Sequence, residues 1–415
     1  MSTGRDSCKG AIEPVKRALM LSFILILLLT TTAFQNSLAV EDETQDVGYT
    51  LKMRVTYSNP VNGTRIWNLT EEDRTIGLFM NNTWQTAYLI NHSYPLEMMK
   101  NDEDGNPIAV LSFPKLRLNP GENVSYTVAY RFLSKPRSIP EIIEEESKSL
   151  EEIPKDLKDR YSGAVGPWLV NDPELRELAH DIVKNETRVL TIVKRFIAWI
   201  NQNITYVTHE IPFYPNETYA KREGDCDDKA VLFTTLCRIF GIPAYIQIGN
   251  IYLPTRAQTS ETYWEGHVTS VLKRIGWHGW AMVYVPPWGW LPVDLTYVRV
   301  GLGDPLNAIK AGAVTLQETI QYLNITQTDY VALSREVRKF FTDNDFYVYM
   351  EDEMVLEPSP EPPKPPEPAS DEPQGQPRLI SVLIVAAVVG VTLAGASIIV
   401  FVLHVRKVKR EKLRE

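Results

Sequence analysis

Cys226 lies at the predicted start of a helix, a position that can make a thiol reactive. It directly follows Asp225, a residue type that caps helix N-termini, and a run with helical spacing leads from it to Gly241. Gly241 and Pro243 end that helix, which places Cys226 in its first turn. Backbone N–H groups and the helix dipole favour a thiolate there, so we predict a lowered pKa for Cys226. The alternative is a buried structural cysteine.

Two later segments supply a base and an acid. Residues 277–284 and 288–294 are rich in aromatic and β-branched residues, and they predict neighbouring strands joined by a Pro-Pro turn. His278 opens the first strand and Asp294 closes the second. A thiol, an imidazole and a carboxylate are the nucleophile, the base and the orienting group of cysteine-dependent acyl transfer. His267 is the alternative base.

These motifs resemble the core of the transglutaminase family, in its microbial branch. They read Gly-Asp-Cys-Asp-Asp-Lys-Ala at 224–230, Gly-Ile-Pro-Ala at 241–244, Trp-His-Gly-Trp at 277–280 and Gly-Trp-Leu-Pro-Val-Asp at 289–294. The resemblance covers roughly residues 172–296 and implies Cys226 as nucleophile, His278 as base and Asp294 as orienting acid. Gly279 stands where the family usually has alanine.

The remaining acidic and sulfur side chains call for no metal or cofactor. Asp227 and Asp228 are adjacent carboxylates without further ligand spacing, and pairing with the helix N-terminus explains them. Cys226 and Cys237 lie about 16 Å apart along one helix, too far for a disulfide. Cys8 belongs to the N-terminal segment, and Cys237 lies on the apolar face of the helix.

Both ends of the chain indicate export and anchoring. An apolar run after Lys16 and Arg17 predicts a signal peptide over residues 1–39, and the uncharged run 379–403 predicts a transmembrane helix over residues 378–404. The basic residues after it place the tail, 405–415, in the cytoplasm. A net charge of -9 argues against a nucleic-acid partner. Nine sequons fit an exposed glycoprotein: Asn62, Asn68, Asn81, Asn91, Asn123, Asn185, Asn203, Asn216 and Asn324.

The resulting fold prediction is α+β. We expect a small β-sandwich at 40–135, a helical connector at 136–171, a transglutaminase-like core at 172–345 and a Pro/Glu-rich stalk at 346–377. In the core, a helix carrying the cysteine packs on an antiparallel sheet, in the papain-like arrangement that the resemblance implies.

The expected function follows from these parts. The chain is predicted to be a cell-membrane enzyme with one C-terminal span and its ectodomain outside. It would transfer or hydrolyse acyl groups of protein or cell-envelope amides through a thioester, as an acyltransferase, peptidase or amidase. The alternative is a non-catalytic cell-surface protein that uses the same fold for binding or structure.

Overall fold

The computed structural model describes residues 46–136, 141–296, 304–310, 312 and 319–358. The predicted signal peptide with Cys8, the predicted span at 378–404 and the tail at 405–415 lie outside these ranges. Within the described ranges, none of the helices has both the length and the apolar content that crossing a membrane requires. The described elements all fall in one compact unit, which begins at Asp46.

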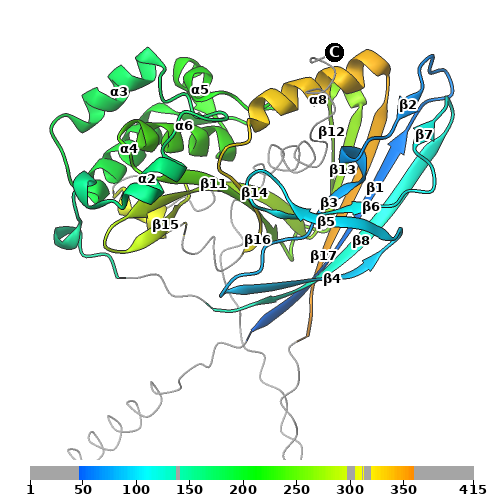
Figure 1. Ribbon diagram of the computed structural model, residues 1–415, viewed down its shortest axis with the longest axis horizontal. Coiled ribbons are helices and arrows are strands. Elements are labelled where there is room, and N and C mark those ends of the chain that lie inside the picture. Colours follow the sequence, from blue (N-terminus) through cyan, green and yellow to red (C-terminus); the bar gives the residue numbers. More distant parts are fainter. Residues whose placement is uncertain (1–45, 137–140, 297–303, 311, 313–318, 359–415) are drawn as a thin grey trace, which may run out of the picture. The chain divides into compact units, whose positions relative to one another are not determined.

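A six-stranded sheet combines strands from distant parts of the chain (Figure 1). Its order is β12 (Thr259–Tyr263), β13 (Val268–Lys273), β17 (Tyr347–Leu356), β1 (Val47–Ser58), β8 (Asn123–Ser134) and β4 (Gln85–His92). The β13–β17 pair is parallel and the other pairs are antiparallel. Buried and less buried residues alternate along β8, which fits a sheet with one apolar face.

Smaller sheets lie beside the large one. They are β3 (Thr75–Gly77) with β6 (Pro107–Leu111) and β5 (Leu96–Asn101), and β2 (Trp67–Asn68) with β7 (Arg117–Leu118). Phe79 packs against Tyr130 and Phe132 of β8 at ring-centroid distances of 4.9 and 4.7 Å. A small β-sandwich at 40–135 was predicted, but β12, β13 and β17, from later in the chain, join its large sheet. Residues 347–356, which we assigned to the stalk, form β17.

The expected connector at 136–171 contains only short helical segments in its described part. These are η2 (Glu144–Glu146), η3 (Leu150–Glu152) and α2 (Lys155–Tyr161). Other α-helices follow as α3 (Pro173–Val183), α4 (Val189–Asn203), α5 (Pro215–Lys221), α6 (Cys226–Ile239) and α8 (Tyr330–Asn344). Single 3-10 turns occur at η1 (Glu72–Arg74) and η4 (Trp264–Gly266).

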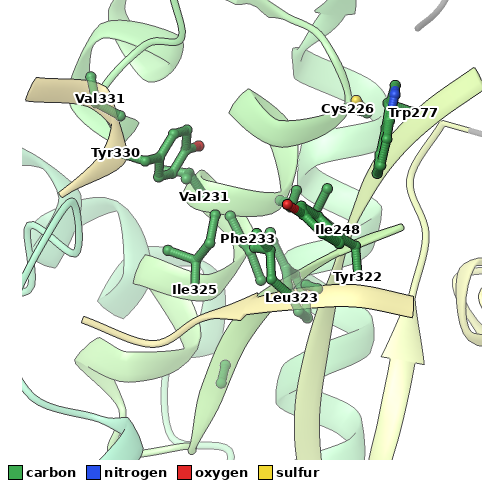
Figure 2. Packing of buried hydrophobic residues seen from close by; sticks show 14 of the residues in the cluster. Cys226, Val231, Phe233, Ile248, Trp277, Tyr322, Leu323, Ile325, Tyr330 and Val331 are labelled. Atoms are coloured by element: carbon green, nitrogen blue, oxygen red, sulfur yellow. The ribbon is translucent and has the colours of Figure 1, made fainter. Parts of the chain in front are cut away.

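The second large sheet is antiparallel throughout and carries the predicted site. Its order is β15 (Gly289–Val293), β14 (Ile275–Val285), β11 (Ala244–Tyr252) and β16 (Thr319–Ile325). Helix α6 packs against β14 and β11. Figure 2 shows Val231 and Phe233 of α6 close to Ile248, Leu323 and Ile325 of the sheet, all within one buried apolar cluster. The predicted helix on an antiparallel sheet is therefore present.

Candidate active site

The first turn of α6 is held by its own acidic residues. Asp225 and Asp228 form a capping box, in which the Asp225 N–H donates to Asp228 Oδ2 at 3.2 Å. The N–H of Phe213 donates to the other oxygen of Asp228 at 2.7 Å. A Cβ on Gly224 would lie 2.6 Å from the Cβ of Asp228, so the approach to the helix requires glycine here. These contacts fix the backbone on which Cys226 stands.

The Cys226 thiol lies against strand β14. The residue is 3% exposed, and the N–H of Gly279 donates a hydrogen bond to its sulfur. Gly279 directly follows His278 in β14. A Cβ on Gly279 would lie 2.9 Å from Cδ1 of Ile248. The packing of Ile248 therefore favours glycine at this position, where the family usually has alanine.

His278 and Asp294 form a buried pair; His278 lies inside β14 instead of opening the strand as expected, and Asp294 directly follows β15. His278 Nε2 lies 2.8 Å from Asp294 Oδ2, and the two side chains are 2% and 1% exposed. The N–H of Thr296 donates to the other oxygen of Asp294 at 2.9 Å, which fixes the carboxylate. With Nε2 directed at Asp294, the opposite nitrogen, Nδ1, is the one placed to exchange a proton with a substrate or a thiol.

The predicted low pKa of Cys226 is contradicted. Burial raises the pKa of this thiol well above its ordinary value, and the negative charges of Asp225 and Asp227 raise it further. The hydrogen bond from Gly279 acts in the opposite direction but does not outweigh them. The sequence indicated the helix N-terminus correctly. It did not indicate that two carboxylates would be buried beside the sulfur, where they disfavour a second negative charge.

The carboxyl groups of Asp225 and Asp227 lie close together at the start of α6, and the Oδ1 atom of each has no hydrogen-bond partner among the described residues. Burial, followed by the charges of Asp225 and Asp228, raises the pKa of Asp227 well above its ordinary value. The hydroxyl of Tyr330 donates to Asp227 Oδ2 at 3.2 Å. Ligand-type atoms of Asp225, Cys226 and Asp227 come within 4.8 Å of one another.

Two neighbours of the thiol were missed by the sequence analysis. Strand β9 (Thr205–Tyr206) pairs in parallel with β10 (Glu223–Gly224), and this register sets Tyr206 opposite Gly224. Burial raises the pKa of the Tyr206 phenol, with the charge of Cys226 as the next cause. The Lys229 ammonium lies 5.9 Å from the Tyr206 ring centroid, and burial lowers its pKa to about 8. Two-residue strands leave no periodic signal from which to predict this pairing.

Other candidates from the sequence lie elsewhere. His267 Nδ1 lies 2.8 Å from the backbone oxygen of Phe346, and its ring stacks on Tyr347 at 4.7 Å. Asp294 is thus brought to His278 rather than to the alternative base. Trp277 donates from Nε1 to Asp352 at 2.8 Å, a contact that links β14 to β17. Cys237 is fully buried, as expected for a core residue.

Comparison with known proteins assigns the part of the chain that holds this site. Residues 176–295 match the model of the transglutaminase-like superfamily, so the chain contains a transglutaminase-like core. No curated protein matches the chain.

Several solved structures resemble the chain at low identity. A provisionally assigned cysteine protease from Cytophaga hutchinsonii has 15% identity and a TM-score of 0.45, and the match covers 77% of this chain and 93% of that one. The periplasmic domain of TgpA from Pseudomonas aeruginosa has 17% identity and a TM-score of 0.29, covering 64% and 92%. Red sea bream transglutaminase has 11% identity and a TM-score of 0.26, covering 62% and 47%.

Proposed function

We propose that the chain is a cysteine-dependent acyltransferase or amide hydrolase that acts through Cys226, His278 and Asp294. The observation that carries this proposal is the buried 2.8 Å contact of His278 with Asp294, beside a thiol that accepts a hydrogen bond from the next residue, Gly279. A histidine oriented by a carboxylate next to a thiol on a helix N-terminus is the arrangement that thioester chemistry requires.

The mechanism follows from which groups hold protons. Because its pKa is raised, Cys226 starts as a thiol, and His278 Nδ1 removes its proton as the sulfur attacks an amide carbonyl. Asp294 accepts the Nε2–H hydrogen bond and stabilises the imidazolium. We assign the N–H of Cys226 the role of an oxyanion donor, because it lies at the N-terminus of α6. The imidazolium then protonates the leaving amine, which yields a thioester.

The second half-reaction releases the enzyme. With His278 again neutral, its Nδ1 takes a proton from an incoming amine or from water, and that nucleophile attacks the thioester carbonyl. Collapse expels the Cys226 thiolate, which recovers a proton from the imidazolium. An amine gives a new amide and water gives a carboxylic acid, so cross-linking and hydrolysis differ only in the acceptor.

Export and anchoring complete the proposal. We infer that a signal peptide at 1–39 and a span at 378–404 hold the catalytic region outside the cell membrane, with the tail at 405–415 in the cytoplasm. Its substrates would then be extracellular proteins or cell-envelope amides. The segments that support this inference lie outside the described residues, and its basis is the hydropathy and charge pattern of the sequence.

The test uses one substrate that reports on both outcomes. Purified full-length chain is incubated with dimethylcasein and a fluorescent primary amine, and mass spectrometry follows amine incorporation, glutamine deamidation and peptide release. We expect at least one of these products, and we expect Cys226→Ala to abolish it. Cys237→Ala is the matched control, because it removes the other cysteine of the same helix, and it should retain turnover.

A non-catalytic binding protein is the second candidate, and one observation favours it. Cys226 is 3% exposed, and its pKa is raised rather than lowered. Iodoacetamide labelling across pH, with the modified cysteine located by mass spectrometry, separates the two candidates. An enzyme should be labelled at Cys226 in the folded state. Absence of both labelling and turnover would leave the binding protein as the supported function.

A further inference from the structure

A cavity of about 550 Å³ lies between the N-terminal β region and the catalytic sheet. Its described lining residues carry no charge, and six of them end in a primary amide. These are Asn81, Asn82, Asn101, Gln247, Gln321 and Asn324. A primary amide both donates and accepts hydrogen bonds. The lining therefore matches a neutral ligand with many hydrogen-bonding groups, and it offers no counter-charge to a phosphate, a carboxylate or an ammonium group.

The strand registers place this cavity on the same sheet face as His278. Gln247 stands opposite Trp280 in β14 and opposite Asn324 in β16. Trp280 lies two residues beyond His278, and the two ring centroids are 6.0 Å apart. Residues directly opposite in a ladder, or two apart in one strand, point to the same face. Trp280 thus neighbours both His278 and the lining residue Gln247 on this face.

Two polar groups at this position have no hydrogen-bond partner among the described residues. Gln247 is 5% exposed and donates from Nε2 to Asn324 Oδ1 at 2.8 Å, while its Oε1 is unpaired. The indole N–H of Trp280, which is fully buried, is also unpaired. Because buried polar atoms are nearly always hydrogen-bonded, the unpaired Oε1 of the lining residue Gln247 points to a ligand that donates a hydrogen bond to it.

A peptide bound as an added strand does not fit this cavity. The outer edge of β16 is occupied by two side-chain amides that imitate a neighbouring strand. Gln85 donates to the backbone oxygen of Gln321 at 2.9 Å and accepts from its N–H at 2.7 Å. Asn106 makes the same pair of bonds with the backbone of Asn324 at 2.9 and 2.7 Å. The main-chain groups that strand addition requires are therefore already paired.

The cavity lining also includes one aromatic residue, Tyr245. Its ring packs on Trp290 at 4.9 Å. Trp280 and Met282 form a small apolar cluster against which Tyr245 and Trp290 pack. The Tyr245 ring beside neutral amides suits the apolar ring face and the hydroxyl rim of a sugar. We propose that this cavity binds a neutral oligosaccharide, independently of the proposed chemistry at Cys226.

The test is direct binding of two neutral trisaccharides, chitotriose and maltotriose, to the purified full-length chain. The chain is produced in a host without N-glycosylation, because the lining residues Asn81 and Asn324 belong to sequons. Titration calorimetry and saturation-transfer NMR should detect binding of at least one sugar. Cys226→Ala should bind equally well, which separates this proposal from the proposed function.

Two variants locate the binding. Gln247→Leu removes the unpaired acceptor and should weaken binding about tenfold, the cost of roughly one neutral hydrogen bond. Gln202→Leu, an exposed glutamine at the end of α4, is the matched control and should have no effect. Because Gln247 lies inside the sheet, Asn101→Ala provides a second variant at an exposed lining residue and should also weaken binding.

Three results would overturn the proposal. The first is that neither trisaccharide binds at 10 mM. The second is that the neutral peptide Ala-Gln-Ala-Gln-Ala binds to the site while the sugars do not. The third is sugar binding that neither Gln247→Leu nor Asn101→Ala weakens, because the sugar would then occupy another part of the chain.

Discussion

The two ends of α6 each hold a buried cysteine, and they differ in what surrounds the sulfur. Cys226 is 3% exposed and Cys237 is fully buried, and both thiols have a pKa raised well above the ordinary value. For Cys237 burial is the whole cause. Around Cys226, by contrast, lie two carboxylates, a donating backbone amide and Asp294. The direction of the pKa shift does not distinguish the two thiols, and their burial differs only slightly. The two thiols differ in the polar groups that surround the sulfur, which are present at Cys226 and not among the causes at Cys237.

The largest expected difference is in turnover, between a variant at the N-terminal end of α6 and a variant at its C-terminal end. Asp294→Asn keeps the shape of the pair but favours the wrong imidazole tautomer, so we expect a loss of about 10³–10⁴-fold in kcat. Cys237→Ala should change kcat by less than about threefold, because it touches no reacting group. Steady-state assays on the casein substrate check both. Equal losses in the two variants would show that the chemistry does not use the N-terminal end of α6.

Alkylation tests the same contrast without a substrate. We expect iodoacetamide to modify Cys226 about 100-fold faster than Cys237, since only Cys226 has a proton acceptor and any exposure. Because the pKa of Cys226 is raised, the rate should climb with pH beyond about pH 8.5 instead of reaching a plateau near neutrality. His278→Ala should slow the reaction. Rates are measured by mass spectrometry of each peptide, and a plateau near pH 7 would contradict the raised pKa.

The buried hydrogen bond from Trp277 of β14 to Asp352 of β17 should make the free energy of unfolding depend on pH. Burial raises the pKa of Asp352 to about 7, although the Trp277 indole lowers it in part. The folded form therefore holds a proton that the unfolded form releases near pH 4, and stability falls as pH rises towards 7. From about pH 5 to pH 8 the loss is roughly 3 kcal/mol. Urea unfolding checks it, and Asp352→Asn should flatten the profile. If the unfolding free energies of the wild type and of Asp352→Asn change equally with pH, Asp352 is not the cause.

Serine substitution gives the smallest expected difference. In Cys237→Ser a hydroxyl is buried in an apolar cluster without a partner, which should cost about 1–3 kcal/mol of unfolding free energy. In Cys226→Ser the hydroxyl can accept the hydrogen bond of Gly279, so the cost should be smaller. Urea denaturation of the two variants measures the difference. A larger loss at Cys226 would reverse the comparison.

Local features of the site could be predicted from the sequence because their signals are local. Asp225 and Gly241 bracket α6 as expected, and Gly241 has the left-handed φ of 68° that ends a helix. The strands that carry His278 and Asp294 were also predicted, from their aromatic and β-branched composition. These features depend on neighbours a few residues away, which a sequence displays directly.

Features that depend on distant residues were not predicted. Tyr330 donates to Asp227 across 103 residues, and no pattern in either segment indicates this contact. The pKa of Cys226 was predicted in the wrong direction, because the helix dipole is visible in the sequence and the burial of Asp225 and Asp227 is not. For the same reason the predicted stalk included residues 347–356, whose partners in the sheet lie far away in sequence.

Strand β17 also determines the order in which the protein can be completed. It lies between β13 and β1, so without it the large sheet separates into one piece with β12 and β13 and another with β1, β8 and β4. Strand β1 is synthesised first, but it cannot pair with its second neighbour, β17, until residue 356 has been translated. Pairing across about 300 residues is slow because of the loop that must close. Until β17 is made, each of the two partial sheets has an exposed edge strand, and exposed edge strands can pair with strands of other chains.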